Sequence, residues 1–133
     1  MIEISTDKNK LDIEMIHSFL TESYWGKGRT IEAVQKSIDN SLCFGVYLNN
    51  NQIGFARAVT DFTIYVYLMD VFIISEARGK GYSKQLMKAI LEEPKLQDCR
   101  DWTLKTKDAH GLYEQFGFNR AQHSEKIMER FIK

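Results

Sequence analysis

The segment Arg78-Gly79-Lys80-Gly81-Tyr82-Ser83 is the part of the sequence best suited to bind an anion. Two glycines let the backbone turn tightly with N–H groups pointing outward, and the apolar spacing that follows predicts a helix over Ser83–Glu93, ending at Pro94. Amides at a helix N-terminus attract phosphate groups. Arg78, Lys80 and Lys84 add positive charge, so the segment is a candidate phosphate site.

The spacing of the glycines distinguishes between the known phosphate-binding motifs that a turn of this kind could belong to. The P-loop pattern GxxxxGK[ST] is absent. A dinucleotide fingerprint, GxGxxG, would need a third glycine where Lys84 stands, and the preceding half of the chain reads as a hairpin. A nucleotide-binding protein is therefore a weak alternative, which predicts stabilisation by ATP or NAD.

Asp70 is the first candidate for a general base, because it lies within an otherwise apolar strand. Burial raises the pKa of a carboxyl group toward the range where it can accept a proton. A structural carboxylate hydrogen-bonded to its neighbours is equally compatible with this position. Asp61, in the turn before the strand, is a weaker candidate.

The histidines and cysteines do not form a recognisable site. No metal-ligand spacing connects His17, His110 and His123, although His110 could share the helix face of Tyr113. No CxxC or basic flank marks Cys43 or Cys99 as reactive. We expect no metal, reduced thiols and a cytoplasmic protein.

The hydrophobic pattern predicts the order β-α-α-β-β-β-α-β-α-β. A turn at Asn49–Gln52 suits a hairpin, since asparagine tolerates positive φ, and Gly117 suits the end of the short helix that Asp108 opens. The predicted elements are a strand at Ile2–Ser5, a helix opening at Asp12, a helix at Ile31–Asp39, strands at Leu42–Leu48, Ile53–Val59 and Thr63–Ile74, the helix Ser83–Glu93, a strand at Trp102–Lys105, a short helix capped by Asp108 and a closing strand at Ile127–Ile132.

These elements define an α/β fold with a mixed sheet, antiparallel in its first half and closed by a βαβ crossover. The 133 residues, 44% of them hydrophobic, predict one domain over 1–133. The 18 basic and 18 acidic residues balance to zero net charge, which argues against binding to nucleic acid or to an anionic membrane. We also find no apolar stretch long enough to cross a bilayer.

Two segments resemble motifs of the GNAT superfamily of N-acetyltransferases. Asp70–Ser83 is similar to the pyrophosphate-binding motif, whose core Arg/Gln-x-x-Gly-x-Gly/Ala is met at Arg78 and Gly81, with Ser83 replacing the last small residue. Ala109–Phe118 resembles the segment Ala-x-x-Leu-Tyr-x-x-x-Gly-Phe. The resemblance extends from about Leu42 to Phe118 and agrees with the predicted order of elements.

The resemblance implies an enzyme that moves the acetyl group of acetyl-CoA directly to a primary amine of a small molecule or protein. It implies that Tyr113 protonates the departing thiolate; the apolar pattern alone would make this residue a core aromatic. Thr106 stands where many members place an asparagine that contacts the cofactor. The other implied acetyl-CoA contacts are Val71, Phe72 and Ile73 for pantetheine, and Arg78, Gly79, Lys80, Gly81, Tyr82 and Ser83 for pyrophosphate.

The acceptor side of the site is less defined. Tyr24 and Trp25 lie in the loop that covers the acceptor pocket in the family, where they would either hold a substrate or anchor the loop. Residues 1–77 carry 10 acidic and 6 basic side chains, which favours a compact cationic amine. A non-catalytic acetyl-CoA sensor or interaction domain remains the alternative, and a homodimer is compatible with the sequence.

Overall fold

The computed structural model describes residues 1–23 and 26–132. A five-stranded sheet has the order β1-β2-β3-β4-β5, in which β4 and β5 are parallel and all other neighbours antiparallel. This confirms the predicted mixed α/β class. The strands are β1 (Ile2–Ser5), β2 (Leu42–Leu48), β3 (Asn51–Thr60), β4 (Tyr65–Ile73) and β5 (Asp101–Leu104), and the helices are α1 (Ile13–Glu22), α2 (Ile31–Asp39), α3 (Tyr82–Leu91) and α4 (His110–Glu114).

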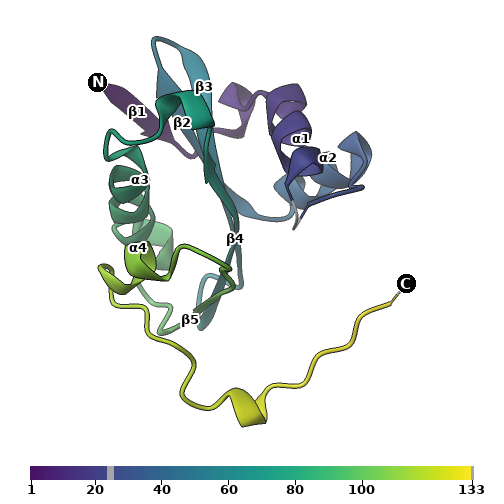
Figure 1. Ribbon diagram of the computed structural model, residues 1–133, viewed down its shortest axis with the longest axis vertical. Helices are drawn as coiled ribbons and strands as arrows, with labels where there is room; N and C mark the ends of the chain where they lie inside the picture. The colour runs from purple at the N-terminus through teal and green to yellow at the C-terminus, as the bar shows by residue number, and fades with distance from the viewer. Residues whose placement is uncertain (24–25, 133) are drawn as a thin grey trace.

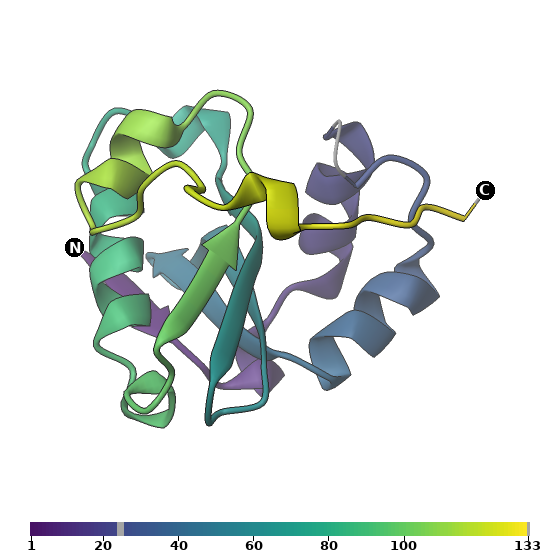
Figure 2. The same ribbon diagram turned by 90° about the horizontal axis from the view of Figure 1, so that it is seen from below.

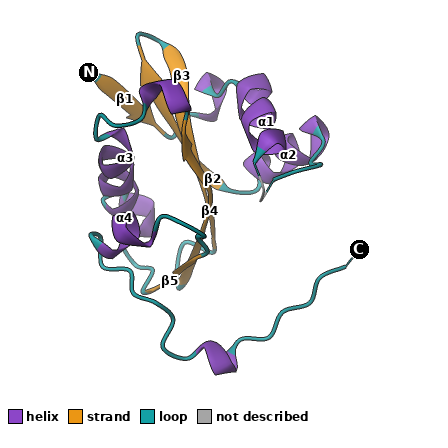
Figure 3. Cartoon of the chain, viewed as in Figure 1, coloured by secondary structure: helices purple, strands orange, loops and turns teal. Residues whose placement is uncertain are grey.

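The helices cover both faces of the sheet (Figures 1 and 3). The pair α1 and α2 packs Ile16 and Leu20 against Phe55 and neighbouring apolar residues on one face. On the other face α3 buries Leu86 and Ile90 in a second core cluster. Each helix presents one apolar stripe to the sheet, as its spacing predicts. No helix in the described ranges is long and apolar enough to cross a membrane.

The ends of several elements follow the local rules of the sequence, with one exception. Asp12 caps α1 by accepting a hydrogen bond from the Met15 amide, and Asn49 and Asn50 adopt positive φ in the β2–β3 turn. Asp108, in contrast, does not cap α4. Ala109 occupies the cap position, and its amide donates instead to the Thr106 hydroxyl at 3.0 Å, so the predicted cap was wrong by one residue.

The predicted closing strand at Ile127–Ile132 is also wrong. Residues 119–132, here called the tail, are all exposed and contain only a short 3-10 turn, Ser124–Lys126. Figure 2 shows the yellow tail crossing in front of the ends of β4 and β5 and ending beyond α1 and α2. Apolar, β-branched residues indicate a strand only where another strand is available to pair with them, and the tail lies away from the sheet of its own chain.

Two irregularities of β4 create the space for a site. Opposite β3, the register shifts between Phe55 and Arg57, so β4 bulges at Asp70, which has a φ of 54°. Opposite β5, pairing runs from Tyr65↔Asp101 to Leu68↔Leu104 and stops there. After Leu104 the chain leaves β4, and within the described ranges the β5-facing edge of β4 has no strand partner from Met69 onward.

Candidate active site

A cavity of about 640 Å³ lies where β4 and β5 separate; we call it the splay cavity. Four of the residues singled out in the sequence line it together: Asp70 and Val71 from β4, Thr106 after β5, and Tyr113 from α4. The remaining lining residues are Arg29, Tyr67, Leu68, Met69, Leu104, Lys105, Lys107, Asp108, Ala109 and Phe131.

Tyr113 is held firmly in the wall of this cavity. The residue is only 9% exposed, and its ring meets Phe118 edge-on with the centroids 6.0 Å apart. The turn after α4 is fixed by Gly117, which has a φ of 90°, and by the Phe118 amide, which donates to the Tyr113 carbonyl. A packed ring of this kind has a defined direction, so the hydroxyl is presented from one fixed position.

Asp70 sits at the centre of a buried ion-pair network. One nitrogen of the Arg29 guanidinium donates to both carboxylate oxygens at 2.9 Å, and Arg57 Nε donates to one of them at 2.9 Å. The Asp70 side chain is 1% exposed. Arg57 also donates to the Ser41 hydroxyl. One carboxylate therefore ties β3, β4 and the segment before α2 together.

This network was not predicted from the sequence, since Arg29 lies 41 positions and Arg57 13 positions from Asp70. The burial of Asp70 was expected; its two partners were not. A carboxylate with two guanidinium groups on its oxygens has the surroundings of a structural anion. Arg29 is further positioned by His17, whose Nε2 lies 2.9 Å from the Arg29 carbonyl oxygen.

The glycine turn has the geometry of an anion site. Gly79 and Gly81 both have a φ of 81°, and a Cβ at either position would meet nothing within 4 Å. Gly81 occupies the cap position of α3, and among the side chains that the structure describes none caps the first amides of that helix. The Arg78 guanidinium folds back to donate to the Ile73 carbonyl at 2.9 Å. The turn is thereby fastened to the end of β4, with its amides open to solvent.

The remaining predicted acetyl-CoA residues differ in what they expose. Phe72 is buried and its ring stacks on Phe19 at 3.9 Å between centroids. Ile73 is buried as well, whereas Val71 is half-buried and faces the splay cavity. Tyr82 and Ser83 are half-buried, and Lys80 is exposed. Along β4 only backbone groups, not the Phe72 and Ile73 side chains, are suited to contact a ligand.

Basic side chains outnumber acidic ones in the lining of the splay cavity. Arg29, Lys105 and Lys107 line it together with Asp108 and with Asp70, which is already paired. The pKa of Lys105 is raised, chiefly by its hydrogen bond to Glu129 at 2.5 Å, so its ammonium group stays charged. Of the acidic residues before position 78, only Asp70 lines this cavity among the described residues. The acidic wall expected for a cationic acceptor is therefore not found there.

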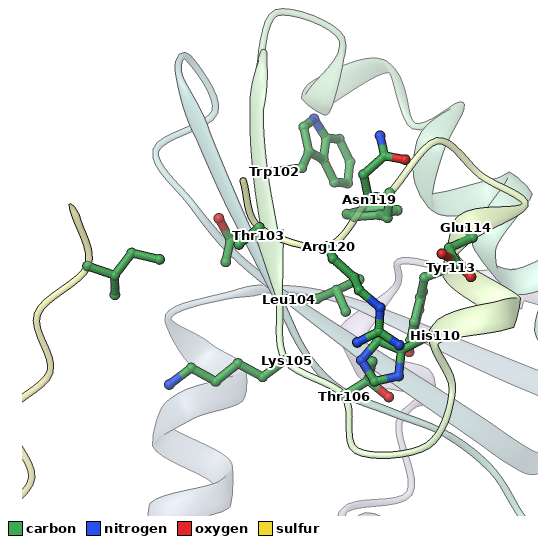
Figure 4. A pocket seen from close by; sticks show the side chains of 13 residues that line it. Trp102, Thr103, Leu104, Lys105, Thr106, His110, Tyr113, Glu114, Asn119 and Arg120 are labelled. Atoms are coloured by element: carbon green, nitrogen blue, oxygen red, sulfur yellow. The ribbon is translucent and has the colours of Figure 1, made fainter. Parts of the chain in front are cut away.

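A second hollow of about 510 Å³, here called the edge groove, lies beside β5 (Figure 4). Trp102 and Leu104 of β5 form one side, and His110 and Tyr113 of α4 face them. Asn119, Arg120 and the tail residue Ile127 complete it. Tyr113 lines both hollows, whereas His110 lines the edge groove and not the splay cavity.

Other candidates from the sequence lie outside the site. Asp61 accepts hydrogen bonds from the amides of Thr63, Ile64 and Tyr65, which lower its pKa to about 2 and make it a poor base. Tyr24 and Trp25 lie outside the described residues. Within the described part of the chain, no three His, Cys, Asp or Glu side chains are grouped to hold a metal ion.

Residues 11–118 match the acetyltransferase (GNAT) family. The match takes in the bulged β4, the glycine turn and α4, and the chain therefore belongs to the GNAT family of acetyltransferases. An uncharacterised N-acetyltransferase, ycf52, of Gracilaria tenuistipitata var. liui is 30% identical over 96 residues, covering 68% of this chain. The chain spans between 49% and 62% of the length of three curated relatives.

Solved structures agree with this assignment. A GNAT-family protein from Xanthomonas campestris pv. campestris is 43% identical, with a TM-score of 0.96 over 99% of this chain and 94% of that one. An acetyltransferase from Clostridium acetobutylicum, crystallised with acetyl-CoA, shares the fold at a TM-score of 0.74 and 16% identity, over 98% of this chain and 96% of that one.

Proposed function

We propose that this protein transfers the acetyl group of acetyl-CoA directly to a primary amine of a small molecule or protein. The observation that carries the proposal is the splay cavity beside Tyr113, where pairing with β5 has stopped along the half of β4 that leads to the glycine turn. The groups proposed to bind the donor, orient it and donate a proton therefore lie next to one another in space. The acetyl-CoA bound to the Clostridium protein of the same fold supports the choice of donor.

The glycine turn would hold the pyrophosphate. The amides of Gly79, Lys80 and Gly81 and of the first residues of α3 are free to donate, and the positive end of the α3 dipole adds to their attraction. The open space at both glycines lets phosphate oxygens approach the backbone closely. Lys80 and Lys84, both exposed, would supply charge without fixed geometry.

The free edge of β4 would hold the pantetheine. Its amides can pair with backbone groups of Met69–Ile73 as an added strand would, because β5 no longer occupies that edge. The bulge at Asp70 changes the direction of this edge next to the splay cavity. The thioester would then lie in the cavity, within range of Tyr113.

The acyl transfer itself needs few groups. The amine nitrogen attacks the thioester carbonyl carbon, the carbon–sulfur bond breaks with its electron pair on sulfur, and the Tyr113 hydroxyl gives its proton to that thiolate. The phenolate regains a proton from water. Because Asp70 is engaged by Arg29 and Arg57, we propose that it positions the site and that water removes the amine proton.

Thiol release from acetyl-CoA with a panel of amine acceptors tests the proposal. The wild-type chain should release coenzyme A at a rate that depends on one class of amine, and thermal stability should rise with acetyl-CoA but not with ATP or NAD. Stabilisation by acetyl-CoA without turnover on any amine would favour the sensor alternative. Stabilisation by ATP or NAD alone would overturn both.

A further inference from the structure

The buried ion-pair network around Asp70 has a net positive charge. Arg29 and Arg57 share its single carboxylate, so two guanidinium groups stand against one anion. Arg57 is also held in place by the Ser41 hydroxyl and, through Nη2, by the Met69 sulfur at 3.4 Å. A net positive charge set among apolar side chains attracts anions. The network is therefore suited to receive a second anionic group.

Arg29 is the basic member of this network that reaches the splay cavity. Its side chain is 26% exposed, against 9% for Arg57 and 1% for Asp70. Arg29 and Asp70 both line the cavity, but the carboxylate is almost completely covered. A molecule that enters the cavity therefore meets the positive side of the network.

Arg29 is held at both ends. Its Nη1 donates to the two oxygens of Asp70, each at 2.9 Å, and its carbonyl oxygen lies 2.9 Å from Nε2 of His17 on α1. Thr30, the next residue, caps α2. A side chain fixed in this way loses little conformational freedom when a ligand binds. The planar guanidinium also has the geometry that carboxylate and phosphate oxygens require.

The proposed position of acetyl-CoA leaves this charge for another ligand. The phosphates of the donor would lie at the glycine turn that begins α3, and its thioester end has no charge. Arg29 directly precedes the α2 cap, and α1 and α2 pack on the face of the sheet opposite to α3 and Tyr113 (Figure 1). The positive charge thus lies toward the side of the cavity from which an acceptor can approach the thioester.

The rest of the wall has a charge that suits an amine nucleophile. Lys105 and Lys107 line the cavity with Asp108, and Lys105 is paired with Glu129. Positive surroundings lower the pKa of an amine, because they disfavour its protonated form. The neutral amine is the form that attacks a thioester. Since such a wall does not attract a cation, an anionic group on the acceptor would supply the attraction.

We propose that the acetyl acceptor is a small primary amine that also bears a carboxylate or phosphate group, and that Arg29 binds this anionic group in the splay cavity. The inference rests on the proposed acetyl transfer and names its substrate class. The amine attacks the thioester as described above, its proton passes to water, and the anionic group is unchanged in the product. This class differs from the cationic amine that the summed charge of residues 1–77 favours, because the acceptor meets the cavity lining rather than the sum.

Pairs of amines that differ in one group test the substrate class. Release of coenzyme A is measured with glycine, β-alanine and γ-aminobutyrate, each against its amide, with O-phosphoethanolamine against ethanolamine, and with putrescine. At least one anionic amine should have a kcat/KM about tenfold or more above that of its neutral partner. The pair that shows this difference identifies the group as carboxylate or phosphate. Equal or faster transfer to the neutral amines or to putrescine would overturn the proposal.

Substitution of Arg29 tests the residue. Arg29→Gln should raise KM for the preferred anionic amine about tenfold or more, and should change KM for its neutral partner little. Lys27→Gln removes the same charge from an exposed position in the same loop and is the matched control, with KM unchanged. Arg57→Gln removes the other partner of Asp70, and should lower stability without altering the preference for the anionic amine.

The same set of variants can refute the role of Arg29. Equal increases of KM for the anionic and the neutral amine in Arg29→Gln would make this arginine a structural residue only. If Arg29→Gln does not fold, Arg29→Lys replaces it, because lysine keeps the charge but not the planar fork. Its KM for the anionic amine should rise in the same direction, and an unchanged KM would contradict the proposal.

Binding measurements separate this inference from the proposed function. Each anionic amine is titrated by calorimetry into the protein saturated with coenzyme A, so that no turnover is needed. If no amine is acetylated, the proposed function fails, whereas binding of an anionic amine that Arg29→Gln weakens still supports the anion site. Transfer to neutral or cationic amines, with no binding of any anionic one, would refute the inference alone. Neither binding nor transfer would overturn both.

Discussion

Asp70 shows how one residue can have the burial of a catalytic base and the surroundings of a structural one. Its side chain is 1% exposed, inside a sheet and next to a cavity, which is where catalytic carboxylates are often found. Both of its oxygens are nevertheless bound by guanidinium groups. The partners, more than the burial, decide what the carboxylate does.

Replacing Asp70 by asparagine should therefore reduce stability more than it changes the chemistry. Two arginines would lose their counter-charge, and breaking a buried ion pair costs about 3 to 5 kcal/mol. Urea unfolding should show this loss, while the shape of the pH–rate profile stays that of the wild type. Asp108→Asn, at an exposed carboxylate of the same cavity, should leave stability unchanged. If the Asp70→Asn protein is stable but its rate no longer rises with pH as the wild-type rate does, Asp70 is the general base.

Tyr113→Phe should lower kcat by about 100-fold, the size expected for the loss of a general acid. The phenyl ring preserves the contact with Phe118, so affinity for acetyl-CoA measured by calorimetry should change little. Tyr67→Phe is the control, because Tyr67 lines the same cavity from β4. Equal effects of the two substitutions would remove the special role of Tyr113.

At the scale of elements, the proposed function makes one anion site of the glycine turn and α3. Gly81→Asp would place a carboxylate at the helix cap, where the phosphate is expected, and should weaken acetyl-CoA binding at least about tenfold relative to Gly81→Ala. The alanine variant is the necessary comparison, because any side chain is strained at a φ of 81°. Similar dissociation constants for the two variants would place the pyrophosphate elsewhere.

The local pattern of the sequence was sufficient for most elements and for the glycine turn. Cap residues such as Asp12 and the asparagines of the β2–β3 turn act through their immediate neighbours, so their effect can be predicted. The pairing of Arg29 and Arg57 with Asp70 could not be, because it requires the order of strands in space. The prediction of a strand in the tail failed for a related reason: a strand pattern does not say whether another strand lies close enough to pair with it.

For the whole molecule, the free energy of unfolding should decline at alkaline pH because the Cys43 thiol is buried. Burial raises the pKa of Cys43 from 9.0 to about 11, so the folded state holds this proton more tightly than the unfolded one. Its contribution is complete below pH 9 and is lost as the pH rises toward 11, by up to about 1 kcal/mol per pH unit. Urea unfolding at pH 8 to 10 should show the decline, and Cys43→Ala should flatten it. Parallel slopes for the two proteins would contradict this assignment.

The short pairing of β5 with β4 also affects how the molecule opens. Only Tyr65–Leu68 and Asp101–Leu104 connect the two strands, whereas β2 and β3 are paired on both sides. Amide protons of β5 should therefore exchange with deuterium through local openings that leave the centre of the sheet protected. A molecule of acetyl-CoA lying between β4 and α4 would bridge the part that opens. Under the proposed function, bound substrate would slow hydrogen–deuterium exchange in β5 and α4 far more than in β2. The substrate would thus stabilise the second half of the fold against local opening.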